Sequence, residues 1–198
     1  MGISVEIGNY GQLTYLDKQT GKKIKGLPVA KRTLNSVSGS FVNLTPSTQL
    51  PKVTFIAEGI ETALSIRDAA KDVRNKQVLA SLGKNNIAKI PSDSLGKWVV
   101  LVLDNDLKNP LSDDVIRKTM GALQAAGKQV TCISPQAINN KKTDYNDLAQ
   151  TGKTSEIIRD VNNAIKQIMD LEHKLVPAQQ NRLCQQPNYE DREKEFLG

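Results

Sequence analysis

Four short apolar runs, separated by stretches with helical periodicity, constrain the fold of this chain more than any other feature. The runs are residues 53–57, 77–81, 98–103 and 129–133. The helical patterns between them span residues 60–73, 85–90 and 112–127. Strands that alternate with helices pair in parallel, and the helices then cover both faces of the sheet. The sequence therefore predicts an α/β fold with a compact, mostly parallel sheet of about four strands.

The residues before this pattern predict β structure. We expect the runs at 13–16 and 23–25 to form a hairpin around a turn at 17–21. Further apolar runs follow at 27–30 and 40–44. A joint with two prolines at 45–51 then predicts a boundary, so that residues 1–50 form a small β-rich segment.

The residues after the pattern predict one more helix and a tail. The helix begins at Thr154 or Ser155 and carries an apolar stripe from Ile157 to Leu175, which is typical of a core-facing side. From Pro177 onward the helical period is lost. We therefore expect an α/β domain over residues 51–176 and a polar tail or linker over residues 177–198.

The composition excludes several classes of protein. In 198 residues the longest uninterrupted apolar run, 98–103, is about a third of the ~18–20 residues that cross a bilayer, so we expect no membrane span. One histidine and two cysteines without a CxxC pair exclude a metal site built from a histidine cluster and argue against a Ser-His-Asp triad. The first residues have no secretory pattern, and we expect a cytoplasmic location.

Positive charge is concentrated near the amino terminus. The net charge is +6, and residues 1–50 carry six basic and two acidic side chains. This excess is compatible with a polyanionic partner such as nucleic acid, although many proteins without such a partner share it.

Acidic side chains follow two of the predicted strands. Glu58 and Gly59 come directly after the run 53–57, and Asp104 and Asp106 come after the run 98–103. Active sites of parallel sheets collect beyond the carboxyl ends of the strands. Carboxylates in this number are the ligands that Mg²⁺ or Mn²⁺ prefers. The same residue types also cap helices and form turns, so each motif alone permits either interpretation.

Three segments together resemble one family, the Toprim domain. They are residues 56–65 (IAEGIETALS), 101–106 (LVLDND) and 142–148 (KTDYNDL). Their order and spacing resemble most the branch in phage- and plasmid-borne primases and in DNA-mobilisation proteins such as conjugative relaxases. The resemblance covers about residues 52–150 and implies a four-stranded parallel sheet with helices on both sides.

The resemblance also assigns roles to individual residues. It implies that Glu58 binds metal or acts as a general acid or base, and that Asp104 and Asp106 are ligands of Mg²⁺ or Mn²⁺. Asp144 and Asp147 match a later acidic segment of this branch, and capping of a loop is the equal alternative for them. Lys84 follows a small-residue turn at 81–83 and is either a phosphate contact or a solvated lysine. Gly59 would let a phosphate or metal approach the backbone closely.

Two classes of function follow from the resemblance. The first is a primase-like module for metal-dependent nucleotidyl or phosphoryl transfer in a DNA-processing protein of a mobile element. The second is a non-catalytic nucleic-acid-binding or docking module within a conjugative relaxase; a Toprim-type nuclease is a third option. Primases of this family carry a zinc module and a basic segment ahead of this domain. We therefore expect the chain to act within a larger parent protein and to be inactive in isolation.

The nucleic-acid partner is expected to be single-stranded DNA, with single-stranded RNA as the alternative. Its phosphates would contact the basic residues of the amino-terminal segment together with Lys84. Those residues are Lys22, Lys23, Lys25, Lys31 and Arg32. None of the four tyrosines is expected to be a nucleophile.

Overall fold

The computed structural model describes most of the chain. Its described backbone comprises residues 2–7, 10–15, 19, 24, 31–34, 36–46, 49–107, 109 and 112–183. Side chains are described at 15, 19, 24, 36–46, 49–107, 109 and 112–172. The chain divides into two compact units, residues 1–162 and 163–198.

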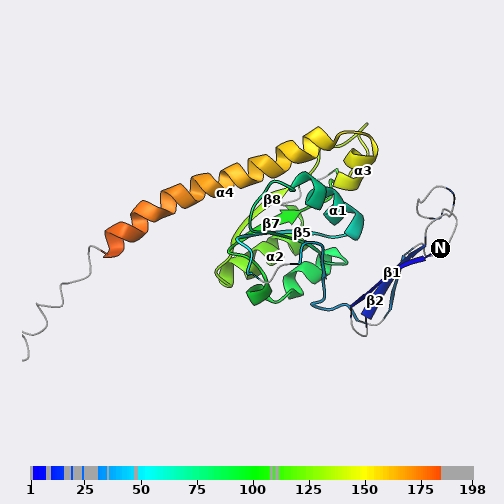
Figure 1. The fold of residues 1–198 in the computed structure, drawn as a ribbon, viewed down its shortest axis with the longest axis horizontal. Coiled ribbons are helices and arrows are strands. Elements are labelled where there is room, and N and C mark those ends of the chain that lie inside the picture. The colour runs from blue at the N-terminus through cyan, green and yellow to red at the C-terminus, as the bar shows by residue number, and fades with distance from the viewer. Residues whose placement is uncertain are drawn as a thin grey trace, which may run out of the picture. The chain divides into compact units, whose positions relative to one another are not determined.

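A five-stranded sheet forms the centre of the first unit (Figure 1). Its strand order is β4-β6-β5-β7-β8, and its strands are β4 (Val42–Asn43), β5 (Val53–Ala57), β6 (Lys76–Ala80), β7 (Trp98–Val102) and β8 (Gln129–Ile133). Four strands are parallel, whereas β4 pairs antiparallel with β6. The predicted mostly parallel α/β sheet is confirmed, with one short antiparallel strand added at its edge.

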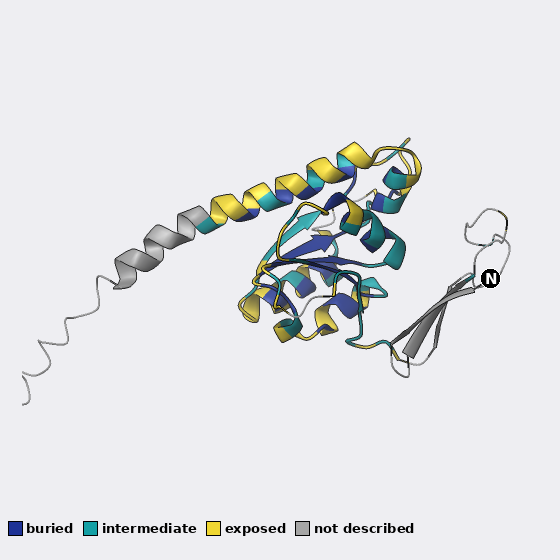
Figure 2. Cartoon of the chain, viewed as in Figure 1, coloured by how far each residue is buried: buried dark blue, intermediate teal, exposed yellow. Residues whose placement is uncertain are grey.

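The central strands are buried on both faces. Every residue of β5 and of β7 is buried, as the dark blue strands in Figure 2 show. Successive side chains of a strand point to opposite faces. Ile56, Val99 and Leu101 therefore belong to one apolar cluster with Ile87 and Ile116 of the covering helices. A strand covered on both sides has no polar face, which explains why these strands are continuous apolar runs in the sequence.

Helices cover the sheet on both sides (Figure 1). Helix α1 (Ile60–Ala69) contacts β5, β6 and α3 (Tyr145–Gln150), while α2 (Asp114–Ala125) contacts β8 and the 3₁₀ helix η1 (Lys84–Lys89). A second 3₁₀ helix, η2, spans Ser92–Ser94. Because β5 to β8 run the same way, the residues after them gather at one end of the sheet. We call it the carboxyl end, and the opposite one the amino end.

The small β segment differs from the predicted hairpin. Strands β1 (Gly2–Ile7), β2 (Tyr10–Tyr15) and β3 (Lys31–Leu34) form an antiparallel sheet in the order β1-β2-β3. The run at 13–16 was predicted to pair with 23–25, and the amide of Ile24 does donate a hydrogen bond of 3.0 Å to the carbonyl of Tyr15. The strands that pair with β2 are, however, β1 and β3. Ile7 pairs with Tyr10 across only two residues, and a short connection costs less closure entropy than a longer loop. Most of the predicted turn at 17–21 lies outside the described residues.

Two further elements cross the boundaries expected from the sequence. Strand β4 joins the five-stranded sheet from a position before the joint at 45–51. The last helix, α4, spans Thr154–Leu183 and continues through Pro177, where the period ends in the sequence. A proline removes one backbone hydrogen bond and costs a helix about 3 kcal/mol, which weakens a helix without always ending it. Ile157 and Val161 of its apolar stripe are buried, as expected.

None of the helices in the described part of the chain combines the length and the apolar character that a bilayer crossing requires.

Candidate functional site

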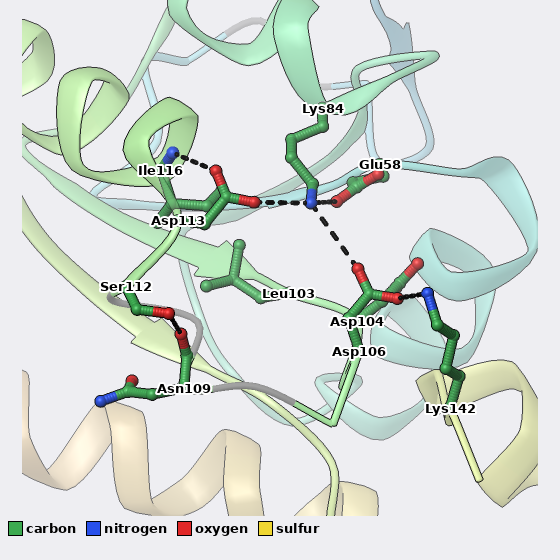
Figure 3. Close-up of a pocket in the computed structure, with 10 residues that line it drawn as sticks. All are labelled: Glu58, Lys84, Leu103, Asp104, Asp106, Asn109, Ser112, Asp113, Ile116 and Lys142. Carbon is green, nitrogen blue, oxygen red and sulfur yellow. Dashed lines mark hydrogen bonds and ion pairs between the residues drawn. The ribbon is translucent and has the colours of Figure 1, made fainter.

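The carboxyl end of the sheet brings the predicted acidic residues to one cavity. Glu58 follows β5, whereas Asp104 and Asp106 follow the adjacent strand β7, and Ala57 and Val102 are partners in register. All three carboxylates line a cavity of about 360 Å³ (Figure 3), a volume in the range of small-molecule sites. Parallel pairing therefore places at one point two motifs that are 46 residues apart in the sequence.

Lys84 lies among these carboxylates. Its Nζ is 3.8 Å from Oδ2 of Asp106 and 4.0 Å from Oε1 of Glu58. It also donates a hydrogen bond of 3.0 Å to Oδ2 of Asp113. The side chain comes from η1, which begins directly after the turn that follows β6. The lysine proposed as a phosphate contact is thus an internal partner of three acidic side chains.

Asp113 is the acidic residue of the cavity that sequence reasoning did not assign to it. It lies inside the helical pattern predicted for residues 112–127, and it is the N-cap of α2. Its Oδ1 accepts hydrogen bonds from the backbone amides of Val115 and Ile116, while the hydroxyl of Ser112 donates to the carbonyl of Asn109. An Asp directly before the first residue of a helix is a common cap, so the sequence carried no signal that Asp113 faces other carboxylates.

Asp104 is the most strongly perturbed acid at the site. Burial, together with the negative charges of Glu58, Asp144 and Asp106, raises the pKa of its carboxyl to about 7. Its Oδ1 is buried and has no hydrogen-bond partner. A carboxylate held in this way gains more from a nearby cation than one that is solvated or hydrogen-bonded.

The lysines of the cavity act in the opposite direction on the other acids. The hydrogen bond from Lys142, whose Nζ is 2.9 Å from Oδ1 of Asp106, lowers the pKa of that carboxyl. The hydrogen bond from Lys84 lowers the pKa of Asp113, and the same bond raises the pKa of the Lys84 ammonium. Lys84 and Lys142 therefore pair with Asp113 and Asp106, respectively, at the edge of the cavity.

Asp144 and Asp147 form a capping box at the start of α3. Each side chain accepts a hydrogen bond from the backbone amide of the other residue, at 2.8 and 3.0 Å. Neither lines the cavity, although the charge of Asp144 contributes to the raised pKa of Asp104. Their capping role is therefore directly visible, and a role as a further acidic site stays a prediction.

The remaining predicted site residues either do not line the acidic cavity or have side chains outside the described residues. Gly59 is the N-cap of α1 in an extended conformation. Lys31 and Arg32 belong to β3, but their side chains lie outside the described residues, as do Lys22, Lys23 and Lys25. The predicted basic surface therefore stays a prediction. Tyr145 is buried and donates a hydrogen bond to Asp160, and burial raises the pKa of its phenol, which does not suit a nucleophile.

A second cavity lies next to the first and shares Lys84 with it. Its volume is about 340 Å³, and no carboxylate lines it. The lining consists of polar and basic side chains and a tight turn, namely residues 36–38, 82–86 and Lys89. The turn has positive φ at Leu82 (64°) and Gly83 (147°), conformations that are uncommon for a residue such as leucine.

The carboxylate oxygens of the acidic cavity are of the type that binds a divalent cation, but their present positions do not form a metal site. Within the described residues, no group of three His, Cys, Asp or Glu side chains is placed to hold a metal ion. The carboxylates of the cavity and the unpaired oxygen of Asp104 are nevertheless hard ligands of the type that Mg²⁺ or Mn²⁺ binds. Lys84 and Lys142 form ion pairs with Asp106 and thereby offset part of this negative charge.

A comparison with family models agrees with the resemblance in the sequence. A family model described as the Toprim domain matches residues 53–154, about half of the chain. A solved structure, the crystal structure of the primase fragment of Bacteriophage T7 primase-helicase protein, matches at 17% identity with a TM-score of 0.44. That match covers 77% of this chain and 56% of the other, so the chain spans little more than half the length of that fragment. The search of curated proteins gives no match.

Proposed function

The chain belongs to the Toprim domain family, and from this premise we propose that it is a module for metal-dependent nucleotidyl or phosphoryl transfer of primase type. We further propose that it acts within a larger DNA-processing protein of a mobile element, of the phage or plasmid primase and DNA-mobilisation branch. The observation that carries the proposal is the cavity at the carboxyl end of the sheet, where Glu58, Asp104 and Asp106 converge.

The residues of this cavity support distinct roles. Asp104 and Asp106 would hold Mg²⁺ or Mn²⁺ together with Glu58, and a bound ion would supply charge neutralisation and alignment of phosphates. Glu58 lies on the neighbouring strand end, and its carboxylate would act in proton transfer. Gly59 leaves the backbone beside it without a side chain that would hinder a phosphate.

A single strand of DNA is the proposed partner. The excess of positive charge in residues 1–50 would attract its phosphates, and Lys84 would contact a phosphate near the acidic cavity. Aromatic residues make up only 4% of the chain, which favours contacts with the backbone over stacking on the bases. The logarithm of the affinity should then fall linearly with the logarithm of the salt concentration, with a slope of about −0.7 per phosphate contact. Affinity that does not change with salt would contradict this partner.

A titration calorimetry experiment tests the metal site. Wild type is titrated with Mg²⁺ and with Mn²⁺ beside Asp104→Asn/Asp106→Asn, which keeps the shape of both side chains and removes their charge. The proposal expects weak binding by wild type and none by the variant. Indistinguishable curves would overturn the assignment of the site.

One observation favours the second candidate, a non-catalytic binding or docking module in a relaxase. The acidic side chains are already paired with Lys84 and Lys142, and no described group is placed to hold a metal. An extension assay with labelled nucleotides on single-stranded DNA separates the candidates, with Glu58→Gln as the control.

We expect no primers from this chain alone, because metal catalysis also needs a template and a nucleotide in alignment. The longer parent protein should make products that Glu58→Gln abolishes. Products from neither protein would favour the binding module, and cleavage of the strand would favour a nuclease.

A further inference from the structure

Lys84 provides a positive charge inside the cavity that is proposed to bind a cation. Its Nζ lies within 4.0 Å of Asp113, Asp106 and Glu58, and its side chain is 28% exposed. Two of these three acids belong to the proposed metal site. A divalent ion that uses Glu58 and Asp106 must therefore compete with an ammonium group that is already tethered there.

Asp113 draws this ammonium away from the other two acids. The distance from Lys84 Nζ to Asp113 is 3.0 Å, against 3.8 Å to Asp106 and 4.0 Å to Glu58. Asp113 is itself held in place, because its Oδ1 accepts hydrogen bonds from the first amides of α2 and leaves Oδ2 for the lysine. The start of α2 thus fixes the position of the acid that holds Lys84.

The lysine also has a place to move to. It lines the second cavity, which contains no carboxylate and about 340 Å³ of space. A long, flexible lysine side chain can shift its charged end toward that cavity while its stem stays in place. Displacement from Glu58 and Asp106 therefore does not require burial of an unpaired charge.

We propose that Lys84 competes with a divalent cation for Glu58 and Asp106, and that Asp113 sets the strength of this competition by holding Lys84 aside. Asp113 then acts on the metal only through the lysine and is not a ligand. The inference rests on the proposed function, since it concerns the affinity of the same site for Mg²⁺ or Mn²⁺. It assigns to two residues outside the three family motifs the control of that affinity.

A double-mutant cycle read by Mn²⁺ titration calorimetry tests the inference. Lys84→Met removes the charge but keeps the length of the side chain, and it should tighten Mn²⁺ binding about fivefold, the size expected for loss of a partly exposed ion-pair partner. Asp113→Asn keeps a good helix cap but releases the lysine toward Glu58 and Asp106. It should weaken binding by a similar factor. The double variant should bind Mn²⁺ as tightly as Lys84→Met alone.

Each departure from this pattern has a definite meaning. Unchanged or weaker binding by Lys84→Met overturns the inference. Weakening by Asp113→Asn that persists in the Lys84→Met background also overturns it, because Asp113 would then be a direct ligand. Lys71→Met, an exposed residue before β6 at the amino end of the sheet, is the matched control and should bind as wild type does. Loss of binding in Asp104→Asn/Asp106→Asn without an effect of Lys84→Met defeats this inference alone, whereas an unchanged Asp104→Asn/Asp106→Asn titration defeats the proposed function as well.

Discussion

At the amino end of the five-stranded sheet, polar groups are paired with one another by hydrogen bonds. The hydroxyl of Thr54 donates to Gln77 and accepts from the amide of Gly96, at 3.0 and 2.9 Å. The backbone of Lys52 bonds to Asn75 and to Trp98, which ties the starts of three strands together. Thr54 and Gln77 are buried, and their hydrogen bonds are satisfied within the protein.

At the carboxyl end the same strands lead into groups that are not satisfied in this way. In the described part of the chain three buried side-chain oxygens have no hydrogen-bond partner, and two of them, in Asp104 and Ser134, follow β7 and β8. Positive φ occurs at both ends, at Asn75 before β6 and at Leu82 after it, but leucine adopts this conformation less readily than asparagine. Unsatisfied and strained groups reduce stability and are typical of functional sites. From this difference we infer that the amino end of the sheet stabilises the fold, while the carboxyl end carries charged groups that a ligand could bind.

The largest expected effect concerns the packing at the amino end. Gly96→Ala would place a Cβ 2.6 Å from the carbonyl oxygen of Pro51 and 2.7 Å from that of Lys52, so the backbone must move. We expect the free energy of unfolding to fall by about 2–4 kcal/mol, as measured by urea denaturation. Gly121→Ala in α2, where nothing lies within 4 Å of the added Cβ, is the control and should stabilise by about 0.5–1 kcal/mol. Equal stabilities of the two variants would contradict this role of the amino end.

The next effect concerns the hydrogen bonds of Thr54. Thr54→Val keeps the shape of the side chain. It leaves the backbone amide of Gly96 and the side-chain oxygen Oε1 of Gln77 without their hydrogen-bond partner. We expect a loss of about 1–3 kcal/mol in the free energy of unfolding, with Mn²⁺ affinity unchanged. Thr54→Ser retains the hydroxyl and should lose less. A change in metal affinity in Thr54→Val would remove the distinction between the two ends.

At the carboxyl end, a substitution at Asp104 is expected to raise the free energy of unfolding instead of lowering it. The folded protein holds the proton of Asp104 up to about pH 7, whereas an ordinary carboxyl loses it near pH 4. Stability from this group is therefore present at low pH and lost as the pH rises through 7. Asp104→Asn should raise the free energy of unfolding by about 1–2 kcal/mol at pH 8 and by little at pH 4, in denaturation experiments with a chelator present. A variant less stable than wild type at pH 8 would contradict this account.

The smallest effect is expected at Lys142. Its side chain is 72% exposed, so the ion pair with Asp106 is screened by water. Lys142→Ala should change the free energy of unfolding by less than about 0.5 kcal/mol. The pKa of Asp106, followed by NMR, should rise because the hydrogen bond from Lys142 holds it low. A larger loss of stability would mean that the carboxyl end also carries part of the fold.

Much of the fold was predictable because its strands are buried on both faces. The runs 53–57 and 129–133 coincide with β5 and β8. The run 77–81 is shifted by one residue from β6, and the run 98–103 extends one residue beyond β7. Strand β4 was not predicted as part of this sheet, because two residues are too short for a periodic signal. In the β-rich segment the pairing of β2 with β1 and β3 was not predicted, because short antiparallel strands carry little information about pairing.

By itself, the sequence determined the α/β class, the family motifs and the three acids at two strand ends. These depend on local patterns, because an apolar run followed by a carboxylate can be recognised in the sequence whatever the position of the strand in the sheet. Tertiary structure alone decided that Asp113 faces Lys84, that Lys84 bridges to Glu58 and Asp106, and that Asp104 is buried beside other negative charges. The energy of such groups depends on their distance and on their separation from water. Neither the distance between these groups nor their separation from water can be derived from the order of residues. Both are defined only when the strand ends lie together in the fold.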